Sequence, residues 1–215
     1  MLPTPDYSHF KCEDYENFYE PAEDTFLFLD ALEKEITYLN SIQPLFAVEI
    51  GSGSGLVINF LAKNLLNKNT VFIATDLNSN ACLATLKTSL QNKNDLITPV
   101  NCDLVKPFES RLKNSIDILM FNPPYVVTES CELGHNDLRA AWAGGKDGRE
   151  VMDRLFPLVD DLLSPNGVFY LVCIKPNQIE KIEETFKSYN FRMEIVINRK
   201  AGIENLFVLK FTRIN

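Results

Sequence analysis

The sequence predicts an α/β fold, with a mostly parallel sheet of seven strands covered by helices on both faces. Short apolar runs typical of buried strands alternate with amphipathic segments typical of helices. This alternation is characteristic of parallel strands joined by helical crossovers. The last two apolar runs follow each other without a helix between them, so we expect the sheet to include an antiparallel C-terminal strand.

Each expected strand is a short, largely apolar run that ends at a polar or glycine residue. The expected strands span residues 45–50, 71–75, 96–102, 116–121, 168–174, 193–198 and 206–212. The third of these runs is less apolar than the others. We therefore expect it to be a weaker strand.

The first expected helix spans residues 20–40, with Pro21 near its start and Glu23 and Asp24 in its first turn. Proline and acidic residues at these positions favour a helix N-terminus. The other expected helices span residues 56–66, 78–91, 149–163 and 178–189. Residues 164–167 form a predicted turn. Residues 126–147 form a long loop, and loops of that length are usually functional or disordered.

The composition is that of a globular protein, with 215 residues of which 46% are hydrophobic. We interpret residues 1–18 as a loose N-terminal arm and residues 19–215 as a single domain. The net charge of −8 argues against stable nucleic-acid binding by the chain alone, because such binding depends on cationic contacts to phosphate.

Cysteine usage and hydropathy indicate a soluble intracellular protein. The five cysteines are scattered without a C-x-x-C pair, which is typical of reduced thiols and predicts no metal site in this chain. No signal peptide is visible, and no apolar run approaches the roughly 20 residues of a membrane span. We expect the protein in the cytoplasm, or also in the nucleus, and not at a membrane.

A glycine-rich turn follows the first strand, with Gly51, Gly53 and Gly55 in the pattern Gly-x-Gly-x-Gly. Glycine lets the backbone turn tightly and approach a ligand at the start of a helix. Asp76 closes the second strand, where a carboxylate can bind both hydroxyls of a ribose. The alternatives are an ordinary strand–helix turn for the glycines and a helix N-cap for Asp76.

Two further acidic residues flank this predicted cofactor site. Glu49 lies just before the glycines and is buried by pattern, so it can bridge to the ligand or to the amides of the loop. Asp103 follows the third strand and is placed either to meet an adenine amino group or to cap a turn. Residues Tyr19–Thr25 are either a plain helix start or a lid over the donor, with Tyr19 and Thr25 offering ring or hydroxyl contacts.

Asn122-Pro123-Pro124-Tyr125 follows the fourth strand and is suited to holding a planar NH2 group. The side-chain oxygen of Asn122 can accept one N–H and the Pro123 carbonyl the second, while the two prolines stiffen the turn. The Tyr125 ring can lie on the flat acceptor group. Such acceptors favour the charge that builds on nitrogen during attack, so the run predicts methyl transfer to a conjugated nitrogen. A plain turn is the alternative.

Several motifs in this order resemble a class I S-adenosylmethionine-dependent methyltransferase with a Rossmann-like fold. They are the glycine turn with Glu49, then Asp76, Asp103 and residues 122–125. Residues 19–25, 121–127 and 141–154 more narrowly resemble the eukaryotic and archaeal branch of the HemK family. The run around Trp142 is the most specific part of this resemblance, which extends from about Tyr19 to the C-terminus.

The resemblance implies an enzyme that methylates the glutamine side-chain amide in the Gly-Gly-Gln loop of a class I translation release factor. S-adenosylmethionine would lie near the residues Tyr19, Thr25, Glu49, Gly51, Gly53, Asp76, Asp103, Leu104 and Asn122. Asn122, Pro123, Pro124 and Tyr125 would hold the acceptor, with Asn122, Pro123 and Tyr125 as its catalytic groups. The family also works with a small zinc-binding activator subunit. The third strand, residues 96–102, would be the sheet edge at which that subunit docks.

Three other functions fit parts of the pattern. An adenine N6-methyltransferase could use the same Asn-Pro-Pro-Tyr run, but would need base flipping on duplex DNA. A protein-lysine methyltransferase would need a base to deprotonate the amine. A binding-only scaffold would lack donor binding. The loop around His135 and the turn at residues 146–149 could contact a protein substrate or simply cap the next helix, and Trp142 is expected to be a packing anchor.

Overall fold

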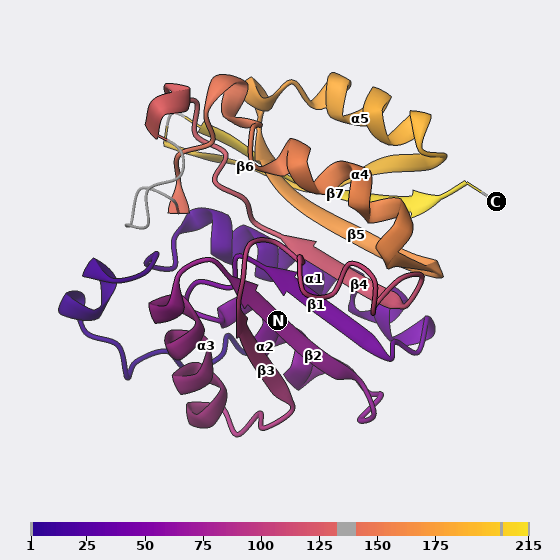
Figure 1. The fold of residues 1–215 in the computed structure, drawn as a ribbon. Helices are drawn as coiled ribbons and strands as arrows, with labels where there is room; N and C mark the ends of the chain where they lie inside the picture. The colour runs from indigo at the N-terminus through magenta and orange to yellow at the C-terminus, as the bar shows by residue number, and fades with distance from the viewer. Residues whose placement is uncertain (1, 133–140, 203, 215) are drawn as a thin grey trace.

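The computed structural model describes residues 2–132, 141–202 and 204–214 (Figure 1). Within these residues, seven strands form one sheet in the order β3-β2-β1-β4-β5-β7-β6. The pairs β1–β2, β2–β3, β1–β4 and β4–β5 are parallel, and β7 is antiparallel to both β5 and β6. The expected mostly parallel sheet with an antiparallel C-terminal strand is confirmed.

The elements lie close to their expected positions. The strands are β1 Phe46–Ile50, β2 Val71–Asp76, β3 Ile97–Asn101, β4 Ile116–Phe121, β5 Leu163–Ile174, β6 Phe191–Ala201 and β7 Glu204–Arg213. The α-helices are α1 Glu23–Ser41, α2 Leu56–Asn64, α3 Ser79–Gln91, α4 Met152–Leu162 and α5 Ile179–Ser188. Short 3-10 helices span Cys12–Glu16 (η1), Ser130–Glu132 (η2), Lys146–Gly148 (η4) and Lys175–Asn177 (η5).

Two expected helices begin three residues later than the sequence pattern suggests. α1 starts at Glu23, because Ala22 is the extended N-cap residue and its amide donates to Thr25 Oγ1 at 3.4 Å. α4 starts at Met152, because the 3-10 turn η4 uses the preceding residues. The residues just before each helix therefore form a separate turn and are not part of the α-helix.

The alternation of side chains along β5 places helices on both faces of the sheet, as expected. The ring of Phe169 lies 5.7 Å from that of Phe186 on α5, whereas the Tyr170 hydroxyl donates to Glu35 of α1 at 2.9 Å. Neighbouring strand residues point to opposite faces, so α5 and α1 cover opposite faces. α4 lies beside α5 through the ring of Phe156, and α2 contacts both α1 and α3 (Figure 1).

The start of β5 differs from the expected turn at residues 164–167. The strand begins at Leu163, which pairs with Ile116, and the next pair joins Val168 to Ile118. Five positions on β5 thus match two on β4, so the intervening residues bulge out of the ladder. Ser164 holds this bulge through a 2.6 Å hydrogen bond to Asp117.

The N-terminal residues pack on the domain and are not a loose arm. The buried rings of Phe10 and Phe18 lie 4.9 Å apart, edge to face, and form a cluster with Ala81 and Ala84 of α3. The Asn78 side chain also donates to the Asn17 carbonyl at 2.6 Å. The arm therefore leads directly into Tyr19 and the start of α1.

Replacing Gly55 with alanine should destabilise the fold strongly, because this glycine closes the turn between β1 and α2. Its φ is +77°, and an added Cβ would lie 2.7 Å from the Thr85 Cα. Gly202 has a φ of +59° with nothing within 4 Å of its Cβ position, so Gly202→Ala is the matched control for backbone strain alone.

In urea unfolding, Gly202→Ala should lower the free energy of unfolding by about 1–2 kcal/mol, which is the penalty for placing a residue with a side chain in the left-handed region. Gly55→Ala should cost about 2 kcal/mol more, because backbone must shift to relieve the clash. Equal losses for the two variants would contradict close packing of α2 on α3 at this glycine.

Candidate active site

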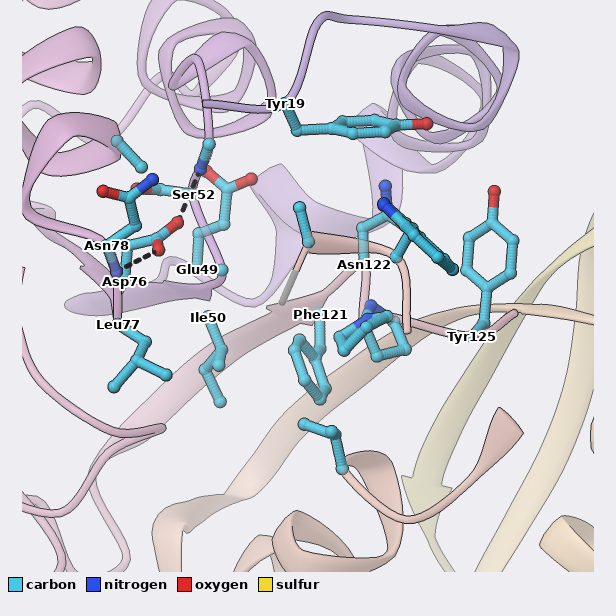
Figure 2. A pocket seen from close by; sticks show the side chains of 18 of the residues that line it. Tyr19, Glu49, Ile50, Ser52, Asp76, Leu77, Asn78, Phe121, Asn122 and Tyr125 are labelled. Carbon is cyan, nitrogen blue, oxygen red and sulfur yellow. Dashed lines mark hydrogen bonds between the residues drawn. The ribbon is translucent and has the colours of Figure 1, made fainter. Parts of the chain in front are cut away.

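A cavity of about 600 Å³ lies at the carboxyl ends of β1, β2 and β4 (Figure 2). The structure brings every site residue expected from the sequence to its wall, namely Tyr19, Thr25, Glu49, Gly51, Gly53, Asp76, Asp103, Leu104, Asn122, Pro123, Pro124 and Tyr125. Figure 2 shows Glu49 and Asp76 toward one end of the cavity, and Tyr19, Asn122 and Tyr125 toward the other. We refer to these as the donor end and the acceptor end, after the roles that the sequence analysis expects for their residues.

At the donor end, the glycine turn is held by the carboxylate of Asp76. One oxygen accepts from the Gly53 amide at 2.9 Å and the other from the Asn78 amide at 2.8 Å. Burial raises the pKa of Asp76, and the two amide hydrogen bonds oppose that shift. The predicted N-cap role belongs to Asn78, whose side chain accepts from the Asn80 amide.

The same turn leaves room for a ligand close to the backbone. Gly51 and Gly53 have φ values of +67° and +52°, and nothing lies within 4 Å of the Cβ position of Gly53. Beneath them, Glu49 is 2% exposed and accepts from the Ile58 amide at 2.9 Å. A cofactor with hydroxyl groups can therefore approach this turn, with Asp76 as the nearest carboxylate.

Asp103 lines the donor end as expected, but its carboxylate is already paired with Arg154 of α4 at 2.5 Å. No sequence pattern indicates this pair, because its partners lie 51 residues apart. Next to it, Leu104 has a φ of +50° and follows the sheet edge into the cavity wall. An incoming amino group would share Asp103 with the Arg154 guanidinium.

At the acceptor end, the side-chain amide of Asn122 has one satisfied end and one free end. Its nitrogen donates to Asp24 at 2.9 Å. Its oxygen is buried and has no hydrogen-bond partner in the part of the chain that the structure describes. A buried acceptor without a donor costs free energy, so this atom is suited to receive an N–H from a bound molecule.

Sequence reasoning missed the importance of Asp24, which it assigned only to the charge of the first helical turn. The residue is 4% exposed, and its carboxylate accepts from the side chains of Tyr19, Asn122 and Tyr125. One signal was present, since Asp24 lies in the same Tyr19–Thr25 motif as one of its two tyrosine partners. Only the fold brings them together.

Tyr125 lines the cavity, and hydrogen bonds at its hydroxyl and at its backbone carbonyl hold it in place. Its hydroxyl donates to Asp24 at 3.2 Å, and its backbone carbonyl accepts from the buried Asn177 side chain at 2.8 Å. Gly148 packs so closely that a Cβ there would lie 2.0 Å from that carbonyl. Asn177 and Gly148, neither expected from the sequence, thus fix the backbone of the Asn-Pro-Pro-Tyr turn.

The turn at residues 146–149 is joined to the start of α4 by side-chain contacts, although the N-cap residue Val151 makes no side-chain cap hydrogen bond. Arg149 pairs with Asp153 at 2.8 Å, and the Lys146 amide donates to Glu150 at 2.8 Å. Trp142 lines the cavity and is partly buried. His135 lies outside the described residues.

Among the residues that the structure describes, no three or more His, Cys, Asp or Glu side chains gather where they could hold a metal ion. None of the described helices combines the length and the apolar character that crossing a membrane requires.

Glu49→Gln should stabilise the ligand-free protein at neutral pH. Burial raises the pKa of Glu49 well above its ordinary value, and Asp76 adds to this while the Ile58 amide opposes it. Because the folded pKa is raised, the contribution of Glu49 is fully present below its unfolded pKa and is lost as pH rises through the folded pKa. The glutamine variant does not undergo this loss.

Urea unfolding of both proteins at pH 5 and pH 8 tests this expectation. The free energy of unfolding of Glu49→Gln relative to the natural protein should rise by at least about 1 kcal/mol between these values, since one pKa unit corresponds to about 1.4 kcal/mol. A difference that stays constant with pH would mean that Glu49 is ionised in the fold.

Comparison with known proteins places the chain in a family. No protein-family model matches it. It is 48% identical to human methyltransferase HEMK2, over 98% of this chain and 96% of that protein. It is 39% identical to the eRF1 methyltransferase catalytic subunit mtq2 of Schizosaccharomyces pombe, over 100% and 97% of the two chains.

A solved structure gives the same result for the fold. A chain of the E. cuniculi Mtq2–Trm112 complex, described as responsible for methylation of the eRF1 translation termination factor, has a TM-score of 0.68 and 26% identity. The match covers 92% of this chain and 99% of that one. From the cavity, its motifs and these full-length similarities, we conclude that the chain belongs to the methyltransferase family that includes HEMK2 and Mtq2.

Proposed function

We propose that the chain transfers a methyl group from S-adenosylmethionine to the side-chain amide nitrogen of a glutamine, the Gly-Gly-Gln glutamine of a class I release factor. In this role it is the catalytic subunit of a heterodimer. The similarity to a catalytic subunit that methylates eRF1 supports the substrate, and the unpartnered Asn122 Oδ1 supports the chemistry. Release factors act in translation, so the cytoplasm is the proposed site of action.

The donor end fits S-adenosylmethionine. In our proposal the Asp76 carboxylate binds the ribose hydroxyls, the backbone of Gly51 and Gly53 approaches the donor, and Asp103 with Leu104 receives the base. The space over Gly53 and the position of the Asp76 carboxylate in the cavity wall support this assignment. When bound, the donor would supply an electrophilic methyl group to the amide nitrogen, which would release one proton to water, and S-adenosylhomocysteine would be the second product.

The acceptor end fits a primary amide. Asn122 Oδ1 accepts one N–H of the glutamine side chain, and the Pro123 carbonyl accepts the other in the proposed complex. These acceptors stabilise the positive charge that develops on nitrogen during attack, in a site already arranged for it. The Asp24 carboxylate is not free to take the substrate proton, because it already accepts hydrogen bonds from Tyr19, Thr25, Asn122 and Tyr125.

The edge strand β3 is suited to binding a partner protein. It is the terminal strand of the sheet, and exposed strand edges readily pair with another chain. Large apolar side chains are exposed on the adjoining elements, namely Leu77, Leu83, Leu86, Leu90 and Leu96. We propose that a small zinc-binding activator subunit docks on this face, which we call the β3–α3 face.

Asn122→Ala should abolish methylation and preserve donor binding, because the methyl acceptor and Asp24 each lose a hydrogen bond while the contacts of Asp76 and the glycine turn are unchanged. We expect kcat on a Gly-Gly-Gln release factor to fall by about 100-fold or more, as for loss of one preorganised polar group. The assay uses the natural heterodimer and radiolabelled S-adenosylmethionine, and calorimetry measures donor affinity. Loss of donor affinity in parallel would mean that the acceptor end is misassigned, and label on lysine or adenine would contradict the glutamine substrate.

Leu83→Glu should weaken activator binding, since a charge would be buried in an apolar interface. The matched control is Ile195→Glu on β6, at the opposite edge of the sheet, where the side chain is similarly exposed, at 50% against 57%. We expect Leu83→Glu to raise the Kd by about tenfold or more and the control to leave it unchanged. Equal effects of the two variants would place the partner elsewhere.

A further inference from the structure

The Asp24 carboxylate is saturated by donors from its own chain. Oδ1 accepts from the Thr25 amide at 2.7 Å and the Tyr19 hydroxyl at 3.2 Å. Oδ2 accepts from Asn122 Nδ2 at 2.9 Å and the Tyr125 hydroxyl at 3.2 Å. Because a carboxylate offers about four lone-pair sites, no site remains for a substrate proton.

The donors other than Asn122 keep their protons. The Thr25 amide is a backbone N–H. Burial, reinforced by the charge of Asp24, raises the pKa of both Tyr19 and Tyr125, so both hydroxyls stay protonated at any working pH. Because the Asp24 carboxylate can only accept hydrogen bonds, Asn122 must turn its NH2 group toward it.

The contact with Asp24 also decides where the oxygen of the Asn122 amide points. An asparagine side chain can turn over and exchange its oxygen and nitrogen at almost no steric cost. Turned over, it would present NH2 to the NH2 of the substrate and oxygen to the Asp24 carboxylate, which are two repulsive contacts. With Asp24 in place, the buried Oδ1 must point to the acceptor, where it has no partner among the described residues.

We propose that Asp24 is a positioning residue that locks the Asn122 amide with its oxygen toward the methyl acceptor. This inference rests on the proposed function, since it assumes that the acceptor is an N–H donor. Asp24 acts through Asn122 and does not touch the substrate. Its removal should therefore lower kcat with little change in donor affinity.

Exchanging the two side chains tests this role directly. In Asn122→Asp, two carboxylates would face each other across the 2.9 Å contact, so the hydrogen bond is lost and one group must take up a proton or move away. The double variant Asp24→Asn/Asn122→Asp restores a donor–acceptor pair with the same net charge. The Thr25 amide holds the oxygen of the new asparagine, which leaves its NH2 group for position 122.

We expect kcat of Asn122→Asp to fall by about 100-fold or more, as for other preorganised polar groups. The double variant should regain at least about tenfold of this loss, in the range of measured couplings between contacting residues. Assays use the heterodimer, a Gly-Gly-Gln release factor and saturating S-adenosylmethionine. Donor affinity, measured by calorimetry, should be unchanged in every variant.

A matched control separates positioning from folding. Glu35 is also an α1 carboxylate held by two donors, the Tyr170 hydroxyl and Lys210, but it lies outside the cavity wall. Glu35→Gln should lower the unfolding temperature and leave kcat unchanged. Asp24→Asn alone should lower kcat at an intact donor affinity. If that single variant does not fold, the comparison of Asn122→Asp with the double variant still decides the question.

The outcomes separate the two proposals. Failure of the natural heterodimer to label glutamine overturns the proposed function and the positioning role with it. Labelling by the natural enzyme, without rescue of Asn122→Asp by the second change, overturns the positioning role alone. Full activity of Asp24→Asn would also overturn it, because Asn122 would then need no carboxylate partner to hold its oxygen toward the acceptor. Rescue with unchanged donor affinity supports it.

Discussion

The site depends on the parallel pairing of β1 with a strand on each side. Ile50 is opposite Thr75 of β2 and Phe121 of β4, so the next residue of each strand is Gly51, Asp76 or Asn122. Parallel strands end at the same sheet edge, which makes this edge the common site of ligand binding in such folds. A register shift of one residue on either side would move a functional side chain away from the cavity.

At this edge, the start of α1 contributes Asp24, a buried carboxylate that accepts hydrogen bonds at both oxygens. Burying a carboxylate is unfavourable unless polar groups replace its water, and Asp24 receives hydrogen bonds from a backbone amide, two tyrosines and an asparagine. The Asn-Pro-Pro-Tyr turn is held on its other side by Asn177. The acceptor end is therefore rigid before any substrate arrives, which is the condition for electrostatic preorganisation.

Sequence patterns were sufficient for most of the fold, because strand and helix periodicity is local. The strand carrying residues 116–121 and the turn after it lie where the pattern placed them. Features that depend on contacts between distant residues were not predictable in the same way. The Asp24–Asn122 hydrogen bond joins residues 98 apart, the Arg154–Asp103 pair joins residues 51 apart, and the bulge at the start of β5 arises from its pairing with β4.

In our proposal, the Asn122 oxygen receives the acceptor N–H while its nitrogen stays on Asp24. A crystal structure of the heterodimer with S-adenosylhomocysteine and a Gly-Gly-Gln peptide would test this arrangement. We expect Asn122 Oδ1 within about 3 Å of the glutamine side-chain nitrogen, a normal N–H···O distance, with the Asp24 contact retained. A glutamine side chain bound away from Asn122, or an Asn122 amide turned over with Asp24 released, would contradict it.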